Sequence, residues 1–152
     1  MESRVDPIAL PQKLHICVVV KDIDKTTQLL SSTFAIGPWD INERRYPKEQ
    51  VLVGKGPFSY RVAFAALGPI ELELIEVVEG NTIHADFLNK QGEGLHHIGF
   101  RVPDLQKTVT ALQQHGIEVV QSAFREGSRY AYMNPTEPGG IMFEFVEKAK
   151  SQ

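Results

Sequence analysis

An internal repeat constrains the fold of this chain more than any other feature of its sequence. The segment LHICVVVKDI at 14–23 returns as HHIGFRVPDL at 96–105. Three identical pairs keep the offset of this repeat further along: Lys25 and Lys107, Thr26 and Thr108, and Leu30 and Leu112. A fixed offset over a strand-like run and the start of a helix is typical of an internal duplication. The sequence therefore predicts two similar halves.

Each half contains one histidine and one glutamate at matching places in the repeat. His15 and Glu73 belong to the first half, and His97 and Glu144 belong to the second. The second half is shorter between its histidine and its glutamate. Two imidazoles and two carboxylates that converge on one point form a ligand set for a divalent metal of intermediate hardness. These four residues are the predicted metal ligands.

One other residue, Glu71, could take the place of Glu73 as a metal ligand. Glu71 lies two positions earlier in an alternating strand, so both carboxylates share one face and Glu71 is an alternative ligand. The repeat favours Glu73, because ELIE at 73–76 matches EFVE at 144–147. Glu144 also lies in the apolar run IMFEFV, where a buried carboxylate without a partner would cost several kcal/mol. A metal ion would supply the missing charge.

The other histidines fit structural or solvated roles. His96 is expected to point to the strand face opposite His97, so it is interpreted as structural. His84 on a short polar helix and His115 at a helix end are expected to be solvated. The single cysteine, Cys17, lies in an apolar strand and is expected to be a small buried hydrophobe.

Composition excludes several classes of protein. A net charge of −3 gives no basic field for nucleic acid or an anionic membrane. One cysteine excludes an internal disulfide and fits a reducing compartment. The sequence shows neither a signal peptide nor an apolar run of the roughly 20 residues that a membrane helix needs. We therefore expect a cytoplasmic protein that binds a small molecule and neither nucleic acid nor membrane.

Hydrophobic periodicity predicts the same order of elements in both halves, strand, helix and three strands (βαβββ). The strands are expected at 13–20, 39–46, 59–67, 69–78, 95–102, 117–124, 129–134 and 141–147. Helices are expected from Asp22 to Gly37 and from Asp104 to about His115, with a linking helix at 82–90 that Asn81 caps. The segment 47–57 is expected to be the longest loop. An irregular leader at 1–12 and a tail at 148–152 flank a single domain at 13–147, with modules at about 13–80 and 95–147.

Four further motifs stand out in the sequence: RVAF at 61–64, IELELIE at 70–76, FLNK at 87–90 and GEGLHHI at 92–98. With the repeated histidines and glutamates, they make the chain similar to the vicinal oxygen chelate superfamily, which includes glyoxalase I, methylmalonyl-CoA epimerases, extradiol dioxygenases and bleomycin resistance proteins. The four motifs most resemble the methylmalonyl-CoA epimerase branch. The resemblance implies an α+β fold of two pseudo-symmetric βαβββ modules, whose curved mixed sheets enclose a metal cavity.

The resemblance also implies roles for individual residues. Its metal ligands fall on His15, Glu73, His97 and Glu144. Glu144 is the expected base that removes a proton next to a chelated carbonyl, with Glu73 or an unassigned residue acting on the other face. Glu73 is compatible with both the epimerases, some of which have Gln there, and glyoxalase I.

One position departs from the epimerase pattern. Arg61 lies near the place of the second acid/base glutamate of the epimerases, and a guanidinium is no base at neutral pH. Arg61 and Arg129 are instead interpreted as clamps for an anionic group of the substrate. Glu49 is a possible replacement base. Tyr132 and Asn134, with Tyr130 on the same strand, are expected to contact the substrate.

Three classes of function remain open at this stage. The first is a metal-dependent epimerase, isomerase or lyase acting on a CoA thioester such as methylmalonyl-CoA or, alternatively, on a glutathione adduct as a lactoylglutathione lyase does. The second is an extradiol-type dioxygenase, and the third is a non-catalytic binding or resistance protein. His and Glu ligands suit Zn, Ni, Co, Mn, Mg and Fe alike. The resemblance also implies a homodimer.

Overall fold

The computed structural model describes residues 5–11, 13–134 and 139–149, and the helices and strands that were predicted occur in the predicted order. The strands are β1 (Leu14–Val19), β2 (Asp40–Tyr46), β3 (Val51–Val53), β4 (Phe58–Leu67), β5 (Ile70–Glu79), β6 (Gly94–Arg101), β7 (Val119–Arg125), β8 (Ser128–Met133) and β9 (Phe143–Lys148). The helices are α1 (Ile23–Phe34), the 3₁₀ turn η1 (Lys48–Gln50), α2 (Ile83–Gln91) and α3 (Leu105–Gln114). Lys148, which was predicted to start the tail, is the last residue of β9.

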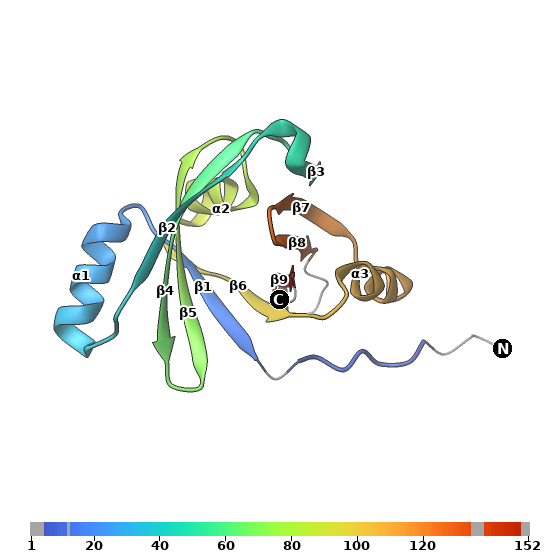
Figure 1. Ribbon diagram of the computed structural model, residues 1–152, viewed down its shortest axis with the longest axis horizontal. Helices are drawn as coiled ribbons and strands as arrows, with labels where there is room; N and C mark the ends of the chain where they lie inside the picture. The colour runs from blue at the N-terminus through green and yellow to red at the C-terminus, as the bar shows by residue number, and fades with distance from the viewer. Residues whose placement is uncertain (1–4, 12, 135–138, 150–152) are drawn as a thin grey trace.

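The described strands form one mixed sheet in the order β2-β4-β5-β1-β6-β9-β8-β7-β3. The first half supplies β2-β4-β5-β1, and the second half supplies β7-β8-β9-β6 in the equivalent order. The halves join where β1 pairs antiparallel with β6. The sheet curves into a nearly closed barrel, so its two ends face its middle (Figure 1). The predicted α+β fold of two pseudo-symmetric modules is confirmed.

The expected loop at 47–57 is the main difference in the fold. It contains η1 and the short strand β3, and Val51 of β3 lies opposite Ala123 of β7. A segment of the first half thus extends the sheet of the second half and helps to close the barrel. A three-residue strand is too short to show an alternating pattern, so its pairing cannot be inferred from the sequence.

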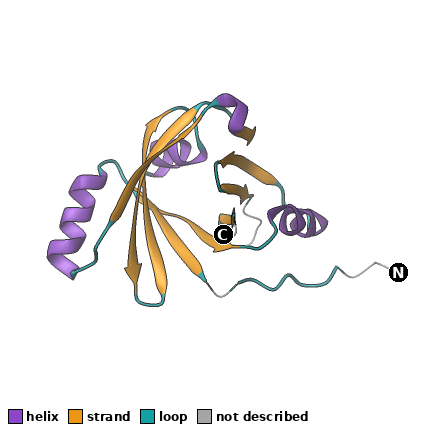
Figure 2. Cartoon of the chain, viewed as in Figure 1, coloured by secondary structure: helices purple, strands orange, loops and turns teal. Residues whose placement is uncertain are grey.

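Two of the helices cover the outside of the curved sheet, one for each half (Figure 2). Ile23 of α1 packs with Ala63 of β4 and Leu74 of β5 in one core cluster. Leu112 of α3 packs with Phe145 of β9 in another. A third cluster, rich in tyrosine and phenylalanine, fills one part of the barrel interior.

The helix starts confirm the repeat at the level of single hydrogen bonds. Asp22 and Asp104 accept a hydrogen bond from the backbone N–H three positions ahead, as predicted for N-caps. The cap of α2 is Thr82 and not Asn81, because the Thr82 hydroxyl accepts from Ala85 N–H. Among the described residues, no helix is both long enough and apolar enough to cross a lipid bilayer.

Candidate metal centre

Four adjacent strands in the middle of the sheet carry the four predicted ligands: Glu73 on β5, His15 on β1, His97 on β6 and Glu144 on β9. The Nε2 atom of His15 lies 3.0 Å from Glu73 Oε2 and 2.9 Å from Glu144 Oε2. The Nε2 atom of His97 lies 3.1 Å from the same Glu144 oxygen and 3.3 Å from His15 Nε2. One donor atom from each residue falls within 4.8 Å of every other. The structure therefore brings all four together.

Strand register explains this convergence. Cys17 lies opposite both Glu73 and His97, so it occupies the gap between those two ligands. Gly99 fills the equivalent gap, opposite both His15 and Glu144. Cys17 and Gly99 are separated by the same offset as His15 and His97, so the repeat places a small residue in both gaps.

Gly99 shows why the gap residue must be small. A Cβ atom at Gly99 would overlap the imidazole ring of His15. The His15 ring therefore occupies the space that a side chain at position 99 would need. Cys17 is fully buried, as predicted.

The electrostatics of the cluster follow from two carboxylates that lie beside the histidines. Burial alone would lower the pKa of His15, but hydrogen bonds to Glu144 and Glu73, together with their charges, raise it to about 10. Burial would raise the pKa of Glu144, but hydrogen bonds from His15 and His97 hold it well below the usual range. Without a metal, the His15 proton supplies the positive charge that these buried carboxylates require.

The donor set fits a divalent metal ion. Two imidazole nitrogens and two carboxylate oxygens are ligands that ions of intermediate hardness accept. The second ring nitrogen of His97, Nδ1, lies 2.8 Å from Nδ1 of His96. Such a partner fixes the orientation of a ligand imidazole, and it leaves Nε2 of His97 directed at the cluster.

The comparisons with known proteins agree with this geometry. A sequence profile of the Glyoxalase/Bleomycin resistance protein/Dioxygenase superfamily matches residues 14–132. The chain belongs to this superfamily. It is also 33% identical over 94 residues to the uncharacterized protein YqjC of Bacillus subtilis (strain 168), a match that covers 60% of this chain and 67% of YqjC.

Solved structures share the glyoxalase-superfamily fold of this chain. A methylmalonyl-CoA epimerase in complex with methylmalonyl-CoA and NH4+ is 24% identical, with a TM-score of 0.71 over 93% of this chain and 96% of that one. The E43Q form of the Streptomyces coelicolor methylmalonyl-CoA epimerase is 23% identical, with a TM-score of 0.72 over 93% and 100%. The hypothetical protein BH1468 of Bacillus halodurans C-125 is 21% identical, with a TM-score of 0.67 over 91% and 94%. At these identities the likeness establishes the fold alone.

A second group of histidines lies beside the glyoxalase-superfamily centre, where the sequence predicted none. His96 was expected on the face opposite His97, but its ring contacts that of His97. The cause is a β-bulge: Cys17 pairs with His97 and Val18 with Leu95, so His96 is the extra residue. A bulge depends on pairing with another strand, so the sequence of β6 alone does not reveal it.

His84 is fully buried, so the prediction of a solvated residue is wrong. Its Nε2 atom lies 3.1 Å from the Tyr132 hydroxyl, and the centroid of its ring lies 4.5 Å from that of the His96 ring, which is tilted by 35°. Burial, with the neighbouring His96 and His97, holds the pKa of His84 well below the usual range. Burial, followed by the charge of His97, lowers the pKa of His96 to about 3. Both rings are therefore neutral at physiological pH.

Arg61 and Arg129, the two predicted substrate clamps, lie on the outer side of the sheet. Arg61 forms a two-pronged ion pair with Asp24 of α1, at 2.9 and 3.0 Å. Arg129 lies 3.1 Å from Glu147. Neither is among the described residues that line the cavity beside the cluster.

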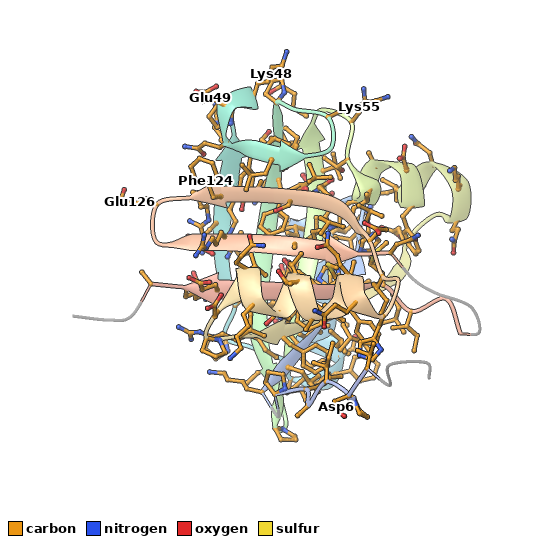
Figure 3. All side chains as sticks on the ribbon, turned by 90° about the vertical axis from the view of Figure 1, so that its right-hand side faces the viewer. Asp6, Lys48, Glu49, Lys55, Phe124 and Glu126 are labelled. Atoms are coloured by element: carbon orange, nitrogen blue, oxygen red, sulfur yellow. The ribbon has the colours of Figure 1, made fainter. Side chains whose placement is uncertain are left out.

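Tyr132 and Asn134 are also absent from that lining. Tyr132 is buried between His84 and the ring of His97, whose centroid is 4.9 Å from its own. Asn134 is exposed at the end of β8. Glu49, the possible replacement base, is exposed on η1, and Figure 3 shows it at the rim of the molecule beside Lys48.

The cavity next to the ligand cluster has a volume of about 130 Å³. His15, Glu73 and Glu144 line it directly. Of the three residues on or just after β8 that were expected to contact the substrate, Tyr130 does line the cavity, together with the aromatic residues Tyr46 and Phe64. The described lining also contains basic residues that were not predicted from the sequence: Lys13, Arg44, Arg101, Arg125 and Lys148. Inward alternation along β2 and β7 is the sequence signal that would have found Arg44 and Arg125.

Proposed function

We propose that this protein is a metal-dependent enzyme that moves a proton at the carbon next to a substrate carbonyl. The convergence of His15, Glu73, His97 and Glu144 on one point at the cavity wall supports this proposal most directly. A CoA thioester such as methylmalonyl-CoA is the first substrate to test, because methylmalonyl-CoA epimerases share the fold.

These four residues would hold the metal. When bound, a divalent ion acts as a Lewis acid that polarises a carbonyl and stabilises the enolate-like charge formed on proton loss. The cavity is small compared with the roughly 300–1,000 Å³ of a pocket for a drug-sized ligand, so it would enclose only the reacting end of a thioester.

Glu144 is the proposed base. Its carboxylate is ionised at neutral pH, because hydrogen bonds from two histidines hold its pKa low, and it faces the cavity. Glu73 is proposed for the other face of the substrate carbon. On β2 and β4 the described cavity-lining residues are Arg44, Tyr46 and Phe64, so these strands contribute no carboxylate to the described lining.

The test is metal analysis of protein purified without chelator, followed by solvent-deuterium exchange into methylmalonyl-CoA. We expect about one divalent metal per chain and exchange at the alpha carbon. Glu144→Gln should slow exchange about 10²- to 10⁴-fold in metal-saturated protein, the range for a lost general base. Glu147→Gln is the matched control, because Glu147 lies on the outer face of the same strand.

Full exchange in Glu144→Gln would remove Glu144 from the role of base. Metal without exchange in the wild-type protein would reject the CoA thioester, and glutathione adducts, the substrates of a glyoxalase-I-like lyase, would be tested next. The homodimer implied by the resemblance stays a prediction, and light scattering of the purified protein would test it.

A further inference from the structure

Among the described residues, the arginines that line the cavity have no acidic partner, whereas the arginines outside it do. Arg45, Arg61 and Arg129, which lie outside the cavity, are each in an ion pair. Arg44, Arg101 and Arg125, which line the cavity, form no ion pair with a carboxylate among the described residues. A positive group that is left unpaired inside a cavity is available to a ligand.

The cavity is rich in positive charge, although the whole chain is negatively charged. The chain has a net charge of −3, yet five basic side chains of the described residues line this cavity: Lys13, Arg44, Arg101, Arg125 and Lys148. Of the three carboxylates in the described lining, Glu73 and Glu144 are engaged with His15, which leaves Glu71 as the one facing the basic set. Burial, with the charges of Arg101, Arg44 and Arg125, lowers the pKa of Lys148, which places these cations near one another.

Arg44 and Arg125 hold equivalent positions in the two halves. Arg44 lies opposite Tyr60 and next to the residue that pairs with Arg61. Arg125 lies opposite Ser128 and next to the residue that pairs with Arg129. The metal ligands lie on the middle strands of the sheet order, whereas β2 and β7 lie at or near its ends. Because the sheet closes on itself, the two arginines face the ligand cluster across the cavity.

The Arg44 side chain is held in place by packing, but one of its N–H groups has no hydrogen-bond acceptor among the described residues. Its guanidinium carbon lies 5.2 Å from the centre of the Phe64 ring, a cation–π contact that fixes the side chain. Its Nε atom is buried and has no hydrogen-bond partner among the described residues. A buried N–H without an acceptor is costly, and an oxyanion would satisfy it.

We propose that Arg44 and Arg125, flanked by Arg101 and Lys148, form an oxyanion subsite opposite the metal centre. Its ligand is a carboxylate or phosphate group of the substrate, additional to the oxygens at the metal. The part of the substrate that this cavity encloses would thus carry an anionic group on its side away from the metal. This inference rests on the proposed function, because it assigns a second contact of the same substrate.

The test is calorimetric titration of the full-length protein, as purified, with inorganic phosphate and separately with malonate at low salt. We expect one saturable site per chain. Arg44→Gln and Arg125→Gln should each weaken binding about tenfold or more, which is the loss of a charged hydrogen bond. Arg45→Gln is the matched control, because Arg45 is the next residue on β2 and its side chain is 79% exposed. It should bind as the wild type does.

Binding that neither cavity variant weakens, or that Arg45→Gln weakens equally, would overturn the subsite. Arginine-dependent binding of phosphate alone would assign a phosphorylated substrate, and of malonate alone a carboxylate. Metal content and thermal melting of each variant show whether the fold and the centre persist. Arginine-dependent binding without any exchange activity would support the subsite and reject the proposed function. Exchange activity without arginine-dependent binding would support the proposed function and reject the subsite.

Discussion

The two halves of the molecule share the same strands, helix and helix-start contacts, which we call their frame, and they differ in the residues added to this frame. In the first half, Glu76 accepts a hydrogen bond from the first backbone N–H of α1, at Ile23. In the second, Glu147 accepts one from Leu105, the first residue of α3, at the same distance of 2.7 Å. Arg61 lies opposite Glu76 in the sheet, and Arg129 lies opposite Glu147. These arginines are therefore an equivalent pair that serves the helix starts.

The additions are asymmetric. The first half contributes β3 to the edge of the second half, and the second half alone has the bulge that turns His96 toward His97. His15 has two carboxylates at its Nε2 atom, whereas His97 has one. The comparison teaches that the repeated residues build the helix starts and the His/Glu cluster of the candidate metal centre, while the unrepeated ones shape the surroundings of that cluster.

The largest effect is expected from removing one ligand histidine from either half. His15→Ala and His97→Ala should each lower metal affinity more than about 100-fold, beyond the range of outer-shell changes. Equilibrium dialysis with Zn²⁺ measures this. A variant that kept wild-type affinity would show that its histidine is not a ligand, and so would break the equivalence of the two histidines.

The two gap residues provide the next test. Gly99→Ala should displace the His15 ring, which would lower metal affinity about 10- to 100-fold and destabilise the fold by about 1–3 kcal/mol. Cys17→Ala at the equivalent position only removes volume, so metal affinity should be unchanged. Dialysis and urea unfolding measure both quantities. Wild-type affinity in Gly99→Ala would contradict the role of this gap.

The helix-capping glutamates should behave as a pair with a smaller effect. Glu76→Ala and Glu147→Ala each leave the first N–H of a helix without its acceptor, which should cost about 1–3 kcal/mol of unfolding free energy. Metal affinity should not change. Urea unfolding that showed a loss in only one of the two variants would show that the frames of the halves are not equivalent.

The smallest expected effect is the release of a proton from His15 when metal binds. The pKa of His15 is raised to about 10 in the metal-free protein, so its ring is protonated at pH 8 and must lose that proton to become a ligand. Metal binding at pH 8 should release about one proton from His15, and affinity should rise as pH approaches 10. Calorimetry in buffers of different ionisation enthalpy measures this release, which His15→Ala should remove. Release that was unchanged in this variant would contradict the assignment.

The frame and the four predicted ligand positions could be read from the sequence, because the repeat keeps its offset from the strand into the helix. The equivalence of Arg44 and Arg125 was missed, because their separation is one residue shorter than that of His15 and His97, on which the repeat was found. The separation between these two arginines is larger than that between the matched glutamates, Glu73 and Glu144. The sequence also did not show that Arg61 and Arg129 share one outward position, which strand pairing reveals.

Contacts between distant segments account for the remaining differences. The fully buried His84 lies on a helix whose sequence is polar, and only its packing against Tyr60 and Tyr132 buries it. The bulge at His96 and the pairing of β3 likewise depend on partner strands. Local periodicity carries no information about such partners.

The most direct test of a metal centre built jointly by both halves is X-ray absorption spectroscopy of the metal-loaded protein. We expect one metal per chain with two imidazole ligands in the wild type, and one imidazole in His15→Ala and in His97→Ala, each measured at saturating metal. An imidazole count that stayed at two in either variant, or a wild-type protein that bound no metal, would contradict the account.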